Sequence, residues 1–339
     1  MTEMARHSDD PLAEHMETPA PIGIPGPVGS GQVAGDPMVD PLNELGEFRS
    51  LRSDVWRQFR RHKGAVVGMV MLILIVVGCF LGPVLLPFDT STPDVMNANR
   101  SPGWPHIWGT DNLGRDAFAR ALIGGRISLL VGFVAMAVSV IAGVLIGVLA
   151  GYFRLLDGPL MRFTDLVLSL PLLPVLLVVI VLFRDPIQDS LGEGLGIFVL
   201  MVLIIGFTSW MSTARIVRGE VLSLKEQEFI LASRSIGTRS RRIIVQHIVP
   251  NVMSPVIVAA TIGVAVAILT ESAVSFLGLG FPLDLPTWGR LLNEAKDRIA
   301  LNIWLVAGPG LLLSATVMSV NLIGDGLRDA LDPQQRSQG

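Results

Sequence analysis

The sequence predicts an all-α polytopic membrane protein with six transmembrane helices, and its composition and the grouping of its apolar residues carry this prediction. Half of the 339 residues are hydrophobic, only 16% are charged, and the mean hydropathy is +0.57. Soluble domains carry about 25% charged residues, so this chain is poor in charge. Its apolar residues gather in blocks of about 20, the length that spans a bilayer as an α-helix. The spans are expected at 64–87, 127–150, 166–183, 195–213, 251–275 and 302–323.

The residues before the first span divide into two segments. Residues 1–47 are acidic and rich in Pro and Gly, which predicts a disordered tail because such a segment cannot bury an apolar core. Residues 48–63 have the spacing of an amphipathic helix that lies at the membrane interface. Its Trp56 and Phe59 are expected to face lipid, while its Arg side chains face anionic head groups.

The distribution of Lys and Arg orients the spans. Basic residues precede the first span and recur between the fourth and fifth spans. By the positive-inside rule both regions face the cytoplasm, and six spans place the C-terminus there as well. The basic residues are Arg52, Arg57, Arg60, Arg61 and Lys63 in the first region, and Arg215, Arg218, Lys225, Arg234, Arg239, Arg241 and Arg242 in the second.

Residues 88–124 are expected to lie outside the cytoplasm. Asp111 and Asp116 resemble the start of a calcium loop, but the intervening residues are not a ligand series and no Glu closes the loop at its twelfth position. A turn in which the Asp side chains accept hydrogen bonds from their own backbone is favoured instead. Residues 117–126 are expected to form a short interfacial helix, with Arg126 reaching toward the head groups.

Small residues repeat along the second span. Gly143, Gly147 and Gly151 occur at every fourth position, a stripe that lets a neighbouring helix approach closely within the bilayer. The stripe predicts tight helix packing and identifies no substrate. The single cysteine, Cys79, lies in the first span and is expected to be packed there.

The familiar catalytic motifs are absent from the sequence. It contains no His-Glu-x-x-His, no Gly-x-Ser-x-Gly, no Cys pair and no phosphate-loop Gly-x-x-x-x-Gly-Lys-Ser/Thr. We therefore expect neither an enzyme nor a metal site, and no nucleic-acid partner. Glu271 is the main ionisable residue inside a span, and such residues often mark ion pathways. It is interpreted either as a polar helix end or inter-subunit contact, or as the ion site of a self-contained ion-coupled secondary transporter.

The segment between spans four and five is longer than a link between neighbouring helices requires. Apolar and small residues at positions i, i+3, i+4 and i+7 predict a short helix with one narrow face. Gly237 is placed to end this helix, because Gly tolerates the left-handed conformation after a helix. A second amphipathic helix follows, and Pro250 fits the first turn of span five. The face of the first helix comprises Phe229, Ala232, Ser233 and Ile236.

Two interpretations of this segment are open. A helix hairpin on the lipid surface would also be rich in basic residues. The order of short helix, glycine, amphipathic segment and proline favours instead a rigid knob that transmits force from a cytoplasmic partner to spans four and five.

The segment also resembles the EAA loop of bacterial ATP-binding-cassette importers, whose pattern is Glu-Ala-Ala, three residues, Gly, and later Ile-x-Leu-Pro. Leu231 stands at the Glu position, Ala232 and Ser233 replace the two Ala, Gly237 matches, and Pro250 closes the loop. Further motifs occur in order along residues 50–333. Together they resemble the C-type permease subunit of dipeptide, oligopeptide and nickel importers. The motifs are GTDNLGRD (109–116), GGRISLLVG (124–132), LSLKEQEFILASRSIG (222–237), SFLGLG (275–280), PTWGRLL (286–292) and GDGLRDALDP (324–333).

This resemblance implies a type I importer transmembrane domain in the bacterial plasma (inner) membrane. Its core would cover residues 125–325, with the EAA-like coupling loop at 221–250 and a cytoplasmic tail at 326–339. The short helix at 228–237 would dock in a cleft of a cytoplasmic ATPase subunit. The residues that match the family's coupling helix are Phe229, Ala232, Ser233, Arg234 and Gly237.

The resemblance also implies partners. A second, homologous permease subunit would complete the pathway as a heterodimer. One or two ATP-binding-cassette ATPase subunits would bind ATP and Mg, and an extracytoplasmic binding protein would deliver the substrate. This chain would then need no cofactor of its own. Peptide is the expected substrate, although the binding protein does most of the selecting in this family. The alternative functions are ion-coupled transport through Glu271 and, more remotely, a membrane-embedded enzyme.

Overall fold

Long helices make up most of the part of the chain that the computed structural model describes, residues 51–85 and 93–331. The all-α prediction is confirmed for these residues. The tail expected at 1–47 lies outside them. The helices are α1 (Leu51–Arg61), α2 (Lys63–Leu85), η1 (Val95–Asn97), α3 (Ala117–Tyr152), α4 (Arg154–Ser169), α5 (Leu172–Leu191), α6 (Glu193–Leu224), α7 (Glu228–Ser235), α8 (Ser240–Ile243), η2 (Ile244–Ile248), α9 (Val249–Phe276), α10 (Trp288–Ala295), η3 (Lys296–Arg298) and α11 (Trp304–Leu331).

Within the described residues, five stretches of helix are each long and apolar enough to cross a membrane: α2, α3, α6, α11, and the continuous run Ser240–Phe276 that ends with α9. A sixth span results if the bent pair α4 and α5 is counted as one. The prediction of six spans is therefore met by five helices and one broken helix. Several helices extend beyond the expected bounds, and α11 continues to Leu331, past residue 326 where the tail is expected to begin.

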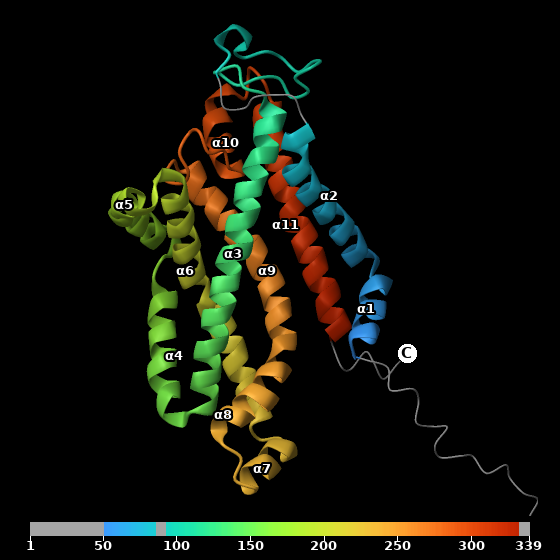
Figure 1. Cartoon of the computed structure of the whole chain (residues 1–339), viewed down its shortest axis with the longest axis vertical. Coiled ribbons are helices and arrows are strands. Elements are labelled where there is room, and N and C mark those ends of the chain that lie inside the picture. The colour runs from blue at the N-terminus through green and yellow to red at the C-terminus, as the bar shows by residue number, and fades with distance from the viewer. Residues whose placement is uncertain (1–50, 86–92, 332–339) are drawn as a thin grey trace, which may run out of the picture. The chain divides into compact units, whose positions relative to one another are not determined.

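The third expected span, 166–183, is wrong as a single straight helix. The chain breaks after Ser169, and the axes of α4 and α5 differ by 89°. Pro171 explains the break, because a proline disfavours helical backbone in the residue before it and donates no hydrogen bond itself. Leu170 is accordingly extended, with ψ 138°. Figure 1 shows α4 running alongside α3 and α5 turned across it.

The glycine stripe of the second span is the contact surface between α3 and α6, as predicted. A Cβ atom on Gly147 would lie 2.6 Å from the carbonyl oxygen of Ala214, and one on Gly151 would lie 2.7 Å from the Cβ of Val221. Only glycine permits this backbone approach. Helices in lipid gain stability from such close packing, because burial of apolar surface provides little drive between them. The pair α3 and α6 is therefore the central contact of the fold.

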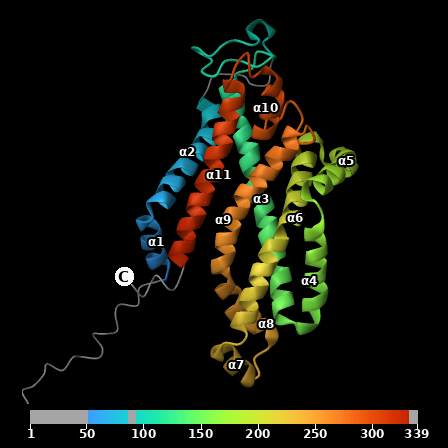
Figure 2. The same cartoon turned by 180° about the vertical axis from the view of Figure 1, so that it is seen from behind.

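Two ends of the helix assembly are distinguished here by the elements found at each. The α10 end carries α10 and residues 93–116, and the α7 end carries α7 and α8 (Figures 1 and 2).

The helix α1 lies beside the last turns of α11. Phe59 of α1 is buried against Ile323 and Ala330 of α11, so the expectation that it faces lipid is wrong. Trp56 is half exposed, as expected for an interfacial side chain.

Arg126 also differs from its expected position. Residues 117–126 are the first turns of α3 and form no separate interfacial helix. The Arg126 guanidinium donates hydrogen bonds to the carbonyl oxygens of Cys79 and Phe80, each at 2.7 Å. The Cys79 carbonyl has no donor within α2, because the residue four positions further on is Pro83, which lacks an N–H, and Arg126 supplies one.

Candidate functional site

The short helix predicted between spans four and five is present as α7. It begins after Gln227, whose backbone is extended, and Glu228 in its first turn complements the positive end of the helix dipole. It ends at Ser235, followed by Gly237 with φ +79°. Two hydrogen bonds close the end: Gly237 N–H to the Arg234 carbonyl at 2.9 Å, and Thr238 N–H to the Ser233 carbonyl at 3.1 Å. This pattern is a Schellman motif, so the predicted role of Gly237 is confirmed.

One side of α7 is held by the rest of the fold. Ile230 is fully buried and packs with Val217 and Val221 of α6 and with Ile248 and Val252 near the start of α9. On the same side, the Arg234 guanidinium lies 5.1 Å from the ring centre of Tyr152, at the end of α3. Because these side chains pack together, a displacement of α7 would also move α6 and α9.

The other side of α7 is uncovered and apolar. Phe229 is 48% exposed and Ile236 is 82% exposed, and Ala232 between them is exposed as well. Ser233 is half-buried, and Arg234 is exposed beyond its contact with Tyr152. The structure thus brings the predicted residues together on one helix. They form a small apolar surface with Ala at its centre and Gly237 at its edge.

The second predicted helix continues into span five without a break. The backbone passes from α8 through the wider turn η2 into α9, with Pro250 in the first turn of α9 as expected. The sequence predicts that Ile244, Val245, Ile248 and Val249 share one apolar face, and in the structure the buried face is rotated from that position. Ile243 and Ile248 are buried, whereas Val245 is 58% exposed. The five-residue turn of η2 shifts the helical register, which a constant period of 3.6 residues does not anticipate.

Glu271 lies inside the chain and has local partners. Its side chain is fully buried. Its Oε1 accepts a hydrogen bond from Ser275 at 2.7 Å, and its Oε2 accepts from Ser128 of α3 at 2.9 Å and from Ser272 at 3.3 Å. Ser128 Oγ in turn accepts from the N–H of Trp288, the first residue of α10. The interpretation of Glu271 as an inter-subunit contact is therefore wrong, because it links α3, α9 and α10.

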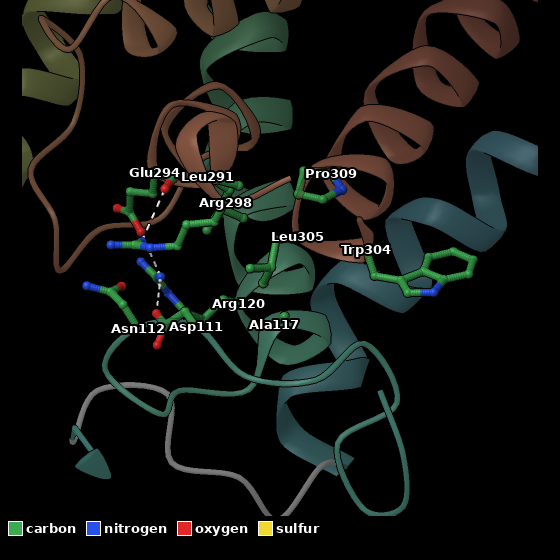
Figure 3. A pocket seen from close by; sticks show the side chains of 11 residues that line it. Asp111, Asn112, Ala117, Arg120, Leu291, Glu294, Arg298, Trp304, Leu305 and Pro309 are labelled. Carbon is green, nitrogen blue, oxygen red and sulfur yellow. Dashed lines mark hydrogen bonds and ion pairs between the residues drawn. The ribbon is translucent and has the colours of Figure 1, made fainter. Parts of the chain in front are cut away.

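A second polar cluster lies at the α10 end and was not predicted as a unit. Arg120 Nη1 lies 2.6 Å from Asp111 Oδ2 and 2.9 Å from Glu294 Oε2, and Arg115 Nε lies 2.8 Å from Asp111 Oδ2. Figure 3 shows Asp111, Arg120 and Glu294 directed toward one another beside a cavity of about 30 Å³, which is room for about one or two water molecules. Arg120 and Glu294 are 174 residues apart, so no local pattern could have paired them.

The turn predicted around Asp111 and Asp116 is confirmed. Asp111 Oδ1 accepts from the N–H groups of Leu113 and Arg115, each at 2.9 Å. Asp116 caps α3 by accepting from the N–H of Ala119 at 2.7 Å. Asp111 is therefore occupied by backbone donors and by Arg115 and Arg120, Asp116 by a backbone donor and the His106 ring, and the segment anchors the start of α3.

The fold is that of an ATP-binding-cassette transporter membrane chain. A chain of the MetNI methionine ABC transporter, solved in inward-facing conformations, matches with a TM-score of 0.51 at 20% identity, and the match covers 62% of this chain and 94% of that chain. Residues 143–337 match the model of the binding-protein-dependent transport system inner membrane component, and residues 50–102 match the N-terminal transmembrane domain of oligopeptide transport permease C. The chain belongs to the family of binding-protein-dependent transport system inner membrane components.

Curated relatives agree with this assignment along nearly their whole length. The oligopeptide transport system permease protein OppC of Haemophilus influenzae is 39% identical over 293 residues, which is 86% of this chain and 91% of the relative. OppC of Bacillus subtilis is 37% identical over 289 residues, 85% of this chain and 91% of the relative. The dipeptide transport system permease protein DppC of Bacillus subtilis is 37% identical over 289 residues, 85% of this chain and 87% of the relative. The chain is therefore a multi-pass membrane permease, as its motifs indicated.

Proposed function

We propose that this chain forms half of the translocation pathway of an ATP-driven peptide importer in the bacterial plasma membrane. Support for the substrate class comes from the relatives, which are named as oligopeptide and dipeptide permeases and match over most of this chain. Support for the architecture comes from the fold shared with an ABC transporter chain. A second, homologous permease would supply the other half of the pathway.

The α7 end is proposed to face the cytoplasm. Basic residues concentrate there, on α1, at the end of α6 and around α7 and α8, in accord with the positive-inside rule. This orientation places both termini in the cytoplasm and the polar cluster of Asp111, Arg120 and Glu294 outside. An extracytoplasmic binding protein would then deliver the peptide to the α10 end.

The helix α7 is proposed to couple this chain to an ATPase subunit. The observation that carries this proposal is the two-sided character of α7: Ile230 anchors it in the fold, while Phe229, Ala232 and Ile236 are left uncovered. An apolar helix face of this kind suits a groove on a partner protein. ATP and Mg would bind to the ATPase subunits, and closure of those subunits would push α7 and, through its packing, α6 and α9. The pathway would open outward in that state and inward after hydrolysis.

The first experiment is purification of the tagged chain from native membranes in mild detergent, followed by mass spectrometry and reconstitution into liposomes. We expect a second permease and phosphate-loop ATPase subunits to co-purify. We also expect ATP-dependent uptake of labelled short peptides once the binding protein is added. Recovery of the chain alone, or uptake that needs an ion gradient instead of ATP, would overturn the proposal and return attention to Glu271.

A further inference from the structure

An open cavity of about 680 Å³ lies near the α7 end, between α6, α9 and α11, three helices that Figure 2 shows from behind. This volume is within the range of about 300–1,000 Å³ that is typical of small-ligand sites. The cavity beside Arg120 at the α10 end is only about 30 Å³, which is too small for a ligand that would fill the larger cavity. The cavity is lined by Ile216 and Glu220 of α6, by Asn251, Ser254, Pro255, Val258, Ala259 and Ile262 of α9, and by Arg328 and Leu331 of α11.

Two opposite charges line this cavity without pairing. Glu220 and Arg328 are both exposed, and within residues 51–85 and 93–331 neither has a hydrogen-bond or ion-pair partner. Some charged residues in the helices near this end are paired, such as Arg218 with Asp157 and Arg215 with Asp165. Ionisable residues that face a cavity in a membrane protein commonly mark a substrate pathway. Here the cavity wall carries one negatively charged and one positively charged side chain.

The polarity of the wall changes along α9. Asn251 and Ser254 line the cavity near the start of α9, and Val258, Ala259 and Ile262 line it further along the helix. The Asn251 amide group donates to the carbonyl oxygen of His247 at 2.6 Å, which leaves the Asn251 side-chain oxygen free to accept. Charged and hydrogen-bonding groups therefore lie toward these helix ends, and apolar groups lie further along α9. Lipid chains would suit the apolar part of the wall but would leave both charges without a partner.

We propose that this cavity binds the two charged termini of an unblocked short peptide on its way out of the pathway. The peptide ammonium group would lie near Glu220 and its terminal carboxylate near Arg328. The oxygen of Asn251 and the hydroxyl of Ser254 are positioned to bond the peptide backbone, and the apolar wall accepts side chains of varied shape. Because the recognised groups are common to all unblocked peptides, the site requires free termini and does not discriminate between side chains. This inference rests on the proposed peptide function.

Thiol protection tests the proposal directly in the complex that co-purifies with this chain. The single native cysteine, Cys79, is fully buried, so Ala259→Cys introduces the reactive thiol of the chain inside the cavity. The rate of its labelling by N-ethylmaleimide is measured in detergent, without ATP or binding protein. Trialanine is compared with N-acetyl-trialanine, which lacks the free amino terminus, with trialanine amide, which lacks the free carboxylate, and with N-acetyl-trialanine amide, which lacks both. A Ser240→Cys thiol, which is exposed outside the cavity, is the control site.

We expect trialanine at about ten times its dissociation constant to slow labelling of A259C about tenfold by mass action. The doubly blocked peptide should give no protection at the same concentration, and S240C labelling should be unaffected by either peptide. E220Q should remove the preference for a free amino terminus but keep the preference for a free carboxylate. R328Q should do the converse. Glu193→Gln and Arg154→Gln, exposed residues outside the cavity, should leave protection unchanged.

Four results would overturn the inference. Equal protection by blocked and unblocked peptides, or protection that E220Q and R328Q leave intact, would remove the role of the two charges. An A259C thiol that is unreactive in the complex would show that another subunit fills the cavity. Absence of protection by trialanine in a complex that imports peptide would place peptide binding elsewhere. If the complex imports no peptide at all, the proposed function fails instead, so the two failures are distinguishable.

Discussion

The N–H of Thr238 donates a hydrogen bond to the carbonyl oxygen of Ser233 at 3.1 Å, across Gly237 in the left-handed conformation. This bond ends α7 and sets the direction in which the chain leaves the apolar face of that helix. A Cβ atom at Gly237 would meet no other group within 4 Å. The requirement for glycine is therefore conformational and does not come from packing.

Replacing Gly237 by Ala should reduce coupling without preventing assembly in the membrane. Left-handed backbone costs a non-glycine residue about 1–2 kcal/mol, so the end of α7 should fray. Peptide uptake by reconstituted complexes should fall several-fold while the amount of chain in the membrane stays the same. Asn tolerates this conformation better, and Gly237→Asn is the matched control that should retain most of the uptake. Equal loss in the Asn and Ala variants would contradict this explanation.

Phe229→Ala should weaken binding of the ATPase subunit with little effect on the stability of this chain. Phe229 is 48% exposed, and large aromatic residues often dominate interface energy. A loss of about 1.4 kcal/mol would be a tenfold loss of affinity, measured by titration of the ATPase subunit onto the purified permease. Phe207→Ala removes a similarly exposed ring from the middle of α6 and should leave affinity unchanged. A similar loss in both variants would point to a general effect on the fold.

Gly147→Val should disrupt the contact between α3 and α6. The added Cβ would lie 2.6 Å from the Ala214 carbonyl oxygen, so the helices must separate. Overpacking of this kind typically costs about 1–3 kcal/mol. The variant should show a lowered melting temperature and a broadened size-exclusion profile. Gly158→Val is the control, because nothing lies within 4 Å of a Cβ there. Equal melting temperatures for the two variants would refute the role of the stripe.

Glu271 substitutions should affect stability and leave the energy source unchanged. Leu at this position leaves the hydroxyls of Ser128 and Ser275 without their buried acceptor, at a cost of about 1–3 kcal/mol each. Gln retains one acceptor oxygen and similar volume, so E271Q should fold and import peptide with ATP. Uptake is measured with and without an ionophore. If E271Q abolishes uptake and the ionophore abolishes uptake by the unmodified chain, Glu271 is an ion site.

Arg120→Met should destabilise the α10 end strongly. Arg120 is nearly fully buried and contacts both Asp111 and Glu294, so its removal leaves the buried Asp111 and the partly buried Glu294 carboxylates without that cation. Breaking such a buried pair typically costs about 3–5 kcal/mol. Arg215→Met breaks an exposed pair with Asp165, for which about 0–1 kcal/mol is expected. Thermal unfolding of both variants in detergent compares the two costs, and similar values would contradict the structural role of Arg120.

Local patterns are sufficient to predict much of this molecule. Apolar blocks of bilayer length predict helices, because in lipid each backbone polar group must find a partner within its own helix. The four-residue spacing of Gly143, Gly147 and Gly151 predicts a close helix contact for the same local reason. Gly237 and Pro250 predict a helix end and a helix start. The candidate coupling residues are therefore predictable from the sequence alone, since they lie within a few turns of one another.

Contacts between distant segments are decided only by the tertiary structure. The period of a helix shows which residues share a face, but it does not show which helix covers that face. For this reason the sequence predicts that Phe59 faces lipid, whereas in the structure Phe59 packs on α11. For the same reason the sequence does not predict the hydrogen bond between Ser128 and Glu271. The pairing of Arg120 with Glu294, and the meeting of Glu220 and Arg328 at one cavity, likewise depend on how α3, α6, α10 and α11 pack together.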